Sequence, residues 1–340
     1  MSLVHGVLNH YSIGALAECY EIKSGLMHST YGVNARKGQF ILQRLHPKLA
    51  TAEIIQDYEA MTSYLAEQGL VSPRLIRTID DQAVHLDEQG HWWRLTTRLP
   101  GTTPDKVEHI RQVEQGARAL GRFHRAVSRF DYVFKSQHPL HDTAGHLSRL
   151  RDAVARPDLT IYQAPITDEI NQILDLLPQL MLPETLPRRV VHGDPKISNI
   201  LFKDGDAIGL IDLDTCNQHT VLVDLGDAIR SWCRDGSEDE RHRFQLDRFE
   251  ALLRGYATDG PSLTRDEIEW FARSGRLITL ELASRFARDA LEDEYFAFDE
   301  TRYPDRRAHN YARTRAMIYL AEDMRRHQDA MDDLVASYLR

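Results

Sequence analysis

Polar side chains in the middle of the chain have the types and the spacing that transfer of a phosphoryl group requires. Asp194, Lys196 and Asn199 follow one another closely, and Asp212 and Asp214 come shortly after them. A carboxylate can take the proton of an attacking hydroxyl, and amide and carboxylate oxygens are ligands that Mg²⁺ prefers. We therefore predict that Asp194 is the catalytic base and that Asn199 and Asp212 are metal ligands. Lys196 would neutralise charge that develops on the transferred group.

The residues around this polar set predict a β-hairpin that brings its two halves together. Short apolar segments precede and follow the first cluster, and the Asp-Gly pair at 204–205 is typical of a hairpin turn. A second apolar strand over 207–211 ends at Asp212. The two polar clusters are therefore expected at the open ends of the hairpin. The step from Asp194 to Asn199 also matches the D-x-x-x-x-N pattern of kinase catalytic loops.

Several neighbours of this set have both a structural and a functional interpretation. Asp214 is either a second metal ligand or an outer-shell hydrogen-bond acceptor. We expect His192 to be structural, with its ring bonded to the backbone of the loop. Asp224 either caps the helix that it opens or reaches back to fix the catalytic loop. Arg230 either pairs with Asp227 on that helix or supports the site.

Strand-rich sequence with one helix is expected before the first proline-rich boundary, and mostly helical sequence after it. Alternation of apolar residues predicts strands within 18–45, and apolar spacing predicts a helix over 50–68. Further short strands are expected over 73–78, 82–87 and 91–98. Prolines and a glycine at 99–104 separate an N-terminal domain, 1–100, from a C-terminal domain, 101–340. Helical segments of the second domain are predicted over 142–154, 167–180, 221–233 and 307–338, with a capping box at 264–267.

The composition is that of an ordinary globular protein and excludes several classes of function. The chain has 340 residues and a formal net charge of -9, with 42% hydrophobic and 27% charged residues. An acidic chain is poorly suited to nonspecific binding of nucleic acid or anionic lipid. The cysteines are scattered, the start does not resemble a signal peptide, and no apolar run is long enough for a membrane span. We expect a cytoplasmic protein, a monomer or a homodimer, without a disulfide framework.

The segment from His192 to Asn199, together with residues 211–215, resembles the aminoglycoside phosphotransferase and choline kinase superfamily. Within it, the chain is most similar to the N-acetylhexosamine 1-kinases, which phosphorylate the anomeric hydroxyl of N-acetylglucosamine or N-acetylgalactosamine. The likeness extends over nearly the whole chain. Its other parts are Ser29 to Tyr31 with Phe40 to Arg44, Trp93 to Gly101, Asp224 to Arg230, and Thr279 to Phe296.

The resemblance implies an α+β, protein-kinase-like fold with two lobes: a small lobe of antiparallel sheet plus one helix, and a larger, mainly helical lobe. ATP would bind between the lobes with Mg²⁺. Nucleotide contacts would come from Gly25, Ser29, Thr30, Gln43, Arg44, Glu59, Thr96, Arg98 and Leu99. The small-molecule acceptor would be contacted by His28, Asp194, Arg285 and Tyr295.

The chain departs from the pattern of this superfamily near both substrates. The third strand usually carries a lysine that pairs with a helix glutamate. Here that strand offers Gln43 and Arg44, and the helix offers Glu59. Either strand residue is a candidate for the phosphate contact. His28 stands near the acceptor, where an asparagine is expected.

Three functions are compatible with these residues. The first is phosphorylation of a sugar hydroxyl, with an N-acetylhexosamine as the leading acceptor, because Arg285 suits a neutral acceptor rich in oxygen. The second is phosphorylation of another small hydroxyl compound, such as an aminoglycoside or an amino alcohol, whose positive charge would need carboxylates such as those in 289–294. The third is a nucleotide-binding module without transfer activity. Retention of the base together with the metal ligands argues against that third function.

Overall fold

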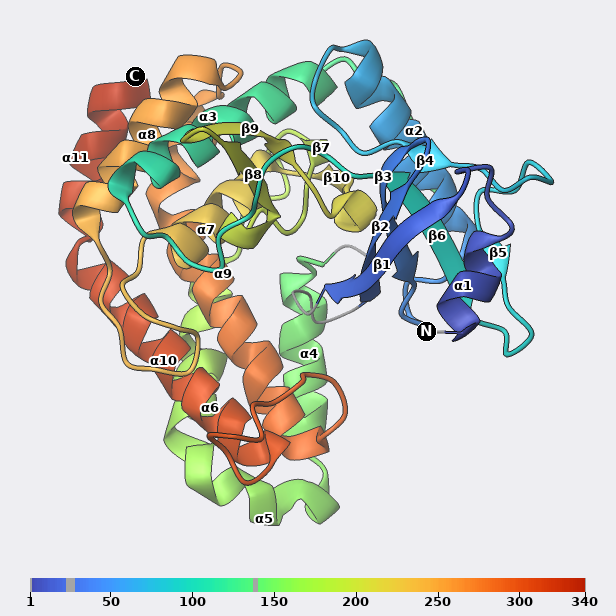
Figure 1. Ribbon diagram of the computed structural model, residues 1–340. Coiled ribbons are helices and arrows are strands. Elements are labelled where there is room, and N and C mark those ends of the chain that lie inside the picture. The colour runs from blue at the N-terminus through green and yellow to red at the C-terminus, as the bar shows by residue number, and fades with distance from the viewer. Residues whose placement is uncertain (1, 23–27, 137–139, 340) are drawn as a thin grey trace.

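An antiparallel sheet is followed by a mostly helical part. The computed structural model describes residues 2–22, 28–136 and 140–339. Figure 1 shows the sheet at one side of the molecule, the long C-terminal helices at the other, and short strands between them. The N-terminal elements are α1 (Ser2–Leu8), β1 (Leu16–Ile22), β2 (Ser29–Ala35), β3 (Gly38–Arg44), α2 (Ala52–Glu67), β4 (Leu75–Ile76), β5 (His85–Leu86) and β6 (Trp92–Thr97).

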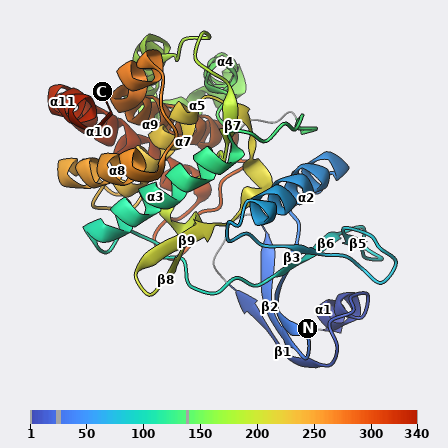
Figure 2. The same ribbon diagram turned by 90° about the horizontal axis from the view of Figure 1, so that it is seen from above.

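The register of the sheet shows which side chains share each of its two faces. The strand order is β1-β2-β3-β6-β4, with β5 also paired to β6, and the pairs are antiparallel. Leu42 lies opposite Leu95, and both are buried with apolar residues of α1. The neighbouring pair in the register is Gln43 opposite Arg94, so these two side chains share the other face. Seen from above, α2 lies between the sheet and the helical part (Figure 2).

The helical part is built around one long central helix. This helix, α9, packs against both α7 and α10. It begins with the predicted capping box, in which the Glu267 amide donates to Thr264 Oγ1 at 3.3 Å and the Thr264 amide donates to Glu267 Oε2 at 2.7 Å. The helices are α3 (Ile110–Val127), α4 (Thr143–Val154), α5 (Thr160–Gln163), α6 (Thr167–Leu176), α7 (Val221–Trp232), α8 (Leu246–Asp259), α9 (Arg265–Glu292), α10 (Arg306–Arg326) and α11 (Gln328–Leu339).

Two small hairpin-like pairs lie between the sheet and the helices. β7 (Arg189–Val191) pairs with β10 (Asn217–His219), and β8 (Ile200–Lys203) pairs with β9 (Asp206–Leu210). The turn between β8 and β9 has positive φ at Asp204 (53°) and Gly205 (87°), as an Asp-Gly hairpin turn requires. The amide of Ile211 donates to the carbonyl of Asn199 at 2.9 Å. The open ends of this hairpin therefore meet, as predicted.

The spacing of apolar residues predicted the positions of most helices and strands, and the structure differs from those predictions mainly in the lengths of the elements. The helix predicted over 50–68 is α2, whereas the strands predicted over 73–78 and 82–87 are reduced to the short β4 and β5. The helical region predicted over 307–338 is divided at His327, where α10 ends. Among the described residues, no helix is both long and apolar enough to cross a lipid bilayer.

Candidate active site

The catalytic loop, residues 192–199, presents the predicted base together with a lysine and an amide. Lys196 Nζ lies 2.7 Å from Asp194 Oδ2. Asn199 Nδ2 donates to the backbone carbonyl of Asp194 at 2.8 Å and to Asp194 Oδ2 at 3.3 Å. Burial raises the pKa of Asp194; the Lys196 charge opposes this, while the carboxylates of Asp227 and Asp212 add to it. A carboxylate with a raised pKa beside a fixed cation is suited to take a proton.

The backbone of the catalytic loop is fixed by a fully buried carboxylate. Asp224 accepts hydrogen bonds from the amides of His192 at 2.7 Å and Gly193 at 2.8 Å. Its Oδ2 also lies 2.9 Å from His124 Nε2. Thr220, rather than Asp224, is the N-cap of α7, so the helix-cap interpretation of Asp224 is wrong. The carboxylate reaches back to the loop.

His192 connects the catalytic loop to the end of β9. Its Nε2 lies 2.9 Å from the carbonyl oxygen of Ile211, so its ring is bonded to backbone. The next residue, Gly193, has φ +87°, and a Cβ there would lie 2.5 Å from the Thr215 carbonyl. A glycine is therefore required where the two loops touch.

The metal loop, residues 211–215, carries the two predicted acidic ligands. Asp212 adopts a left-handed conformation with φ 65°, and none of the described residues donates a hydrogen bond to its carboxylate. Asn199 uses its Nδ2 on the carbonyl of Asp194, which leaves its Oδ1 available. A carboxylate and an amide oxygen are the donor set that Mg²⁺ accepts. The residues present thus fit a hard divalent ion at Asp212 and Asn199.

Asp214 is held by an arginine that sequence reasoning missed. Arg94 on β6 donates Nη1 to Asp214 Oδ1 at 2.6 Å and Nη2 to Asp214 Oδ2 at 2.8 Å. The Arg94 charge lowers the pKa of Asp214, although burial acts in the opposite direction. A signal was available, because an arginine between Trp93 and Leu95 in an apolar strand must find a partner if it is buried. The sequence did not say which partner.

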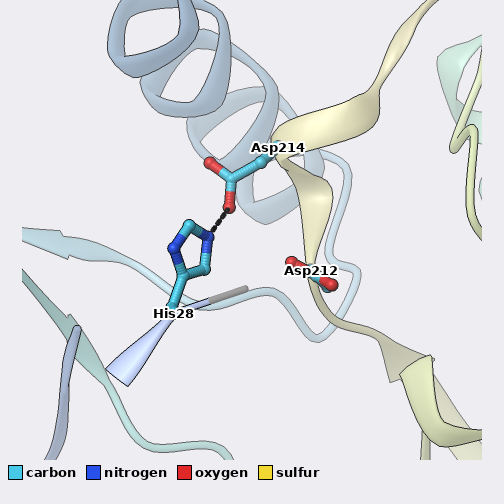
Figure 3. Close-up of side chains that lie close together, drawn as sticks. All are labelled: His28, Asp212 and Asp214. Atoms are coloured by element: carbon cyan, nitrogen blue, oxygen red, sulfur yellow. Dashed lines mark ion pairs between the residues drawn. The ribbon is translucent and has the colours of Figure 1, made fainter. Parts of the chain in front are cut away.

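His28 points at Asp214, while Asp212 lies to one side (Figure 3). One ligand atom from each of these residues falls within 4.8 Å of the others. However, His28 Nδ1 accepts the backbone amide of His46 at 3.1 Å, so the neutral ring carries its proton on Nε2. That atom lies 3.6 Å from Asp214 Oδ2. In this tautomer His28 is a donor toward the carboxylate, not a metal ligand.

The strand residues that are predicted to contact the nucleotide lie on both faces of the sheet. Thr30 lies opposite Gln43, on the face that carries Arg94, and Gln43 Oε1 accepts from Arg94 Nη2 at 2.8 Å. Ser29 lies opposite Arg44 on the other face, where Arg44 Nη2 donates to Ser29 Oγ at 3.1 Å. The geometry thus favours Gln43 over Arg44 as the residue on the side of the metal loop.

The remaining nucleotide candidates are dispersed. Glu59 pairs with Arg77 at 2.5 Å and with neither strand residue, so it does not replace the usual helix glutamate here. Thr96 is buried on β6, and Arg98 donates to the hydroxyl of Tyr20. Leu99 is partly buried just beyond β6. Gly25 lies outside the described residues.

The acceptor candidates Arg285 and Tyr295 meet around one aromatic ring. The guanidinium of Arg285 lies 5.5 Å from the ring centre of Phe296, and the Tyr295 ring packs edge-on against Phe296 at 4.9 Å. Tyr295 is 37% exposed, and Lys48 from the N-terminal part lies 4.5 Å from its ring centre. This group therefore connects the two parts of the molecule.

The acidic run at 289–294 is largely occupied by other groups. Asp289 accepts the backbone amides of residues 294–296 at 2.7 to 2.9 Å. Glu292 pairs with Arg288 at 2.7 Å, and Asp293 lies 3.2 Å from a nitrogen of Arg306. Glu292 and Asp293 thus have arginine partners, while a role of this run, with Glu294, in a pocket for a cationic acceptor stays a prediction.

Arg230 supports the site only indirectly. Its guanidinium pairs with Asp227 on α7 at 2.7 Å and with Glu238 at 2.7 Å. Among the described residues, these two carboxylates are its ion-pair partners. Asp227 and Arg230 thus form the ion pair along one helix that their three-residue spacing allows. The second oxygen of Asp227 is buried without a hydrogen-bond partner.

Comparison with known proteins assigns the chain to a family. Residues 18–259 match the model of the phosphotransferase enzyme family that is abbreviated APH. The chain belongs to this family. Curated relatives include the homoserine kinase of Chelativorans sp. (strain BNC1), 27% identical over 77% of each chain. The homoserine kinase of Methylobacillus flagellatus is 27% identical over 85% of this chain and 84% of its own.

Solved structures share the fold at low sequence identity. An aminopropanol kinase has a TM-score of 0.66 and 16% identity, and covers 100% of this chain and 99% of its own. An amicoumacin kinase solved with AMP-PNP and Ca²⁺ has a TM-score of 0.65 and 16% identity, over 98% and 93%. This APH-family protein thus has a protein-kinase-like fold and is an ATP-dependent small-molecule kinase.

Proposed function

We propose that the protein transfers the γ-phosphate of ATP to a hydroxyl of a small polar acceptor, with Asp194 as the base. The observation that carries this proposal is the joint position of Asp194, Lys196 and Asn199 at 2.7 to 3.3 Å from one another, beside the metal loop. The acceptor oxygen forms a bond to the γ-phosphorus while the bond to the β-phosphate oxygen breaks. The hydroxyl proton passes to Asp194, and ADP leaves.

Each residue of the site has a defined part in this transfer. Lys196 would compensate charge on the transferred group, since phosphoryl transfer depends on positioning and charge neutralisation. Asn199 and Asp212 would hold Mg²⁺, which supplies charge neutralisation on the phosphate oxygens when bound. Gln43, Thr30 and Thr96 would face the nucleotide. Ser29, Arg44 and Glu59 would contribute at most indirectly, because their side chains bond elsewhere.

A small amino-hydroxy compound is the first acceptor class that we propose. Its support is the set of curated relatives, which are named homoserine kinases, and the fold shared with an aminopropanol kinase. A polycationic acceptor has less support, because Glu292 and Asp293 are already paired with arginines.

An N-acetylhexosamine is the second acceptor class. It is favoured by the arrangement of Arg285, Phe296 and Tyr295, in which aromatic faces and a guanidinium occur together. Such a surface suits a neutral ring with several hydroxyls. His28 Nε2 faces Asp214, so we propose no direct contact of His28 with either acceptor.

An ATP-consumption screen with Mg²⁺ tests the proposal and separates the classes. The panel contains homoserine, 1-amino-2-propanol, choline, N-acetylglucosamine, N-acetylgalactosamine, glucose and kanamycin, with phosphorus NMR of each product. Turnover of homoserine or aminopropanol above all sugars supports the first class, and an anomeric phosphate supports the second. Faster turnover of kanamycin would contradict both acceptor classes. Silence across the panel with Asp194 intact would contradict the proposed range of acceptors.

A further inference from the structure

A buried ion pair joins the sheet to the metal loop. The two hydrogen bonds from Arg94 to Asp214, at 2.6 and 2.8 Å, use both carboxylate oxygens. The side chains are 1% and 3% exposed. The Arg94 guanidinium also lies 3.9 Å from the ring centre of Tyr58 on α2, and it donates to Gln43 on β3. Groups from three other parts of the chain, the metal loop, α2 and β3, therefore fix this one arginine.

The charges of this pair argue against a metal ion bound directly to Asp214. An arginine without access to water needs the charge of its carboxylate, since an uncompensated buried charge is very costly. A divalent ion on the same carboxylate would bring a second cation against the guanidinium. Asp212 is in the opposite situation, because no described residue donates to its carboxylate. Within the metal loop, the Asp214 carboxylate is thus paired with an arginine, whereas the Asp212 carboxylate is available to a metal ion.

We propose that Arg94 and Asp214 are positioning residues for the divalent metal. The pair would fix the metal loop so that Asp212 presents its carboxylate to the ion, with Asp214 outside the coordination sphere. Residues in this position orient metal ligands, and their loss typically costs about 10- to 100-fold in metal affinity. The inference rests on the proposed role of Asp212 and does not depend on which acceptor is used.

Mn²⁺ binding to the full chain in the presence of AMP-PNP tests this without turnover. Free Mn²⁺ is counted by its EPR signal during titration of the wild type, Arg94→Met, Arg94→Lys and Asp212→Asn. We expect Arg94→Met to weaken Mn²⁺ binding by about 10- to 100-fold. Arg94→Lys should have an Mn²⁺ affinity between those of the wild type and Arg94→Met, because it keeps the charge but not the paired hydrogen bonds. Arg77→Met, which removes an exposed arginine from the same lobe, should bind as the wild type does.

The sign of the Arg94→Met effect decides the question. If Asp214 were itself a ligand, removal of Arg94 would free its carboxylate, and Mn²⁺ would bind equally well or more tightly. That result would overturn the proposal while the proposed function stands. Unchanged binding in Asp212→Asn would overturn the metal assignment as well. If circular dichroism shows that Arg94→Met does not fold, Tyr58→Leu replaces it in the titration. We expect Tyr58→Leu to lose less Mn²⁺ affinity than Arg94→Met would. Wild-type Mn²⁺ affinity in Tyr58→Leu would refute the proposal.

Discussion

The catalytic loop and the metal loop lie side by side, but they are anchored in opposite directions. Asp224 holds the catalytic loop from α7, and its other partner, His124, lies on α3. All of these contacts are inside the helical part. The metal loop is held by Arg94, which belongs to the sheet. One half of the site is thus set by the fold of a single lobe, and the other half by how the two lobes meet.

This difference separates two kinds of failure. Disturbing the helical part should displace the base together with Asn199, whereas disturbing the contact between the lobes should mainly displace Asp212. A kinase that closes on its substrates can therefore keep its base constant while its metal site responds to closure.

The largest effect is expected for Asp194→Asn. Removing the base should lower kcat by about 10²- to 10⁴-fold, the usual contribution of general base catalysis. Mn²⁺ affinity with AMP-PNP should fall much less than kcat, because the replacement amide keeps an oxygen that can accept from Asn199 and Asp212 belongs to the other loop. Turnover is measured with the acceptor found in the screen. Wild-type turnover in this variant would show that the base assignment is wrong, and lost Mn²⁺ binding would show that the two loops are not separate.

A large effect on stability is expected for Asp224→Asn. The carboxylate is fully buried, and the amide that replaces it has one acceptor oxygen in place of two, so it cannot accept from both amides of the loop. Leaving a buried donor without an acceptor costs about 1–3 kcal/mol in the free energy of unfolding, measured by denaturant titration. Asp206→Asn is the matched control, because its pair with Arg111 is exposed and should contribute less than about 1 kcal/mol. Equal losses in the two variants would contradict the anchoring role.

The catalytic loop was predictable because its partners are local. The base, the amide and the hairpin that brings Asp212 to Asn199 all lie within one short segment, and turn chemistry fixed their relation. The anchor of the metal loop was not predictable in this way. Arg94 and Asp214 are 120 residues apart, and nothing in the spacing of either residue names the other. A lone arginine in an apolar strand predicts a buried partner without identifying it.

The acceptor side also depends on partners that the sequence names only in part. The carboxylates of Glu292 and Asp293 suggested a site for a cation because the sequence shows them clustered. Glu292 pairs with Arg288 one turn earlier on α9, a partner that helical spacing offers, whereas Asp293 lies near Arg306 on α10, a contact that only the packing of the helices reveals. Charge clusters are interpretable from sequence only when their partners are close along the chain.

The pH dependence of activity should reflect the surroundings of Asp194. Burial raises the pKa of this carboxyl, and the nearby Asp227 charge adds to the effect against Lys196. The base acts when it is deprotonated, so kcat/KM should fall as the pH drops through a pKa above the ordinary value of about 3.9. Asp227→Asn removes a negative charge, lowers that pKa and should move the acid limb to lower pH. An unmoved limb, or one shifted upward, would contradict this electrostatic account.

The smallest effect is expected for Glu59→Gln. Glu59 pairs with Arg77, and the side chains are 33% and 43% exposed, so the pair should contribute less than about 1 kcal/mol to the free energy of unfolding. The KM for ATP should also be unchanged, because Glu59 contacts neither Gln43 nor Arg44. Initial rates at varied ATP measure this, with Arg77→Met as the matched partner variant. A raised KM in Glu59→Gln alone would mean that α2 does supply a carboxylate to the nucleotide.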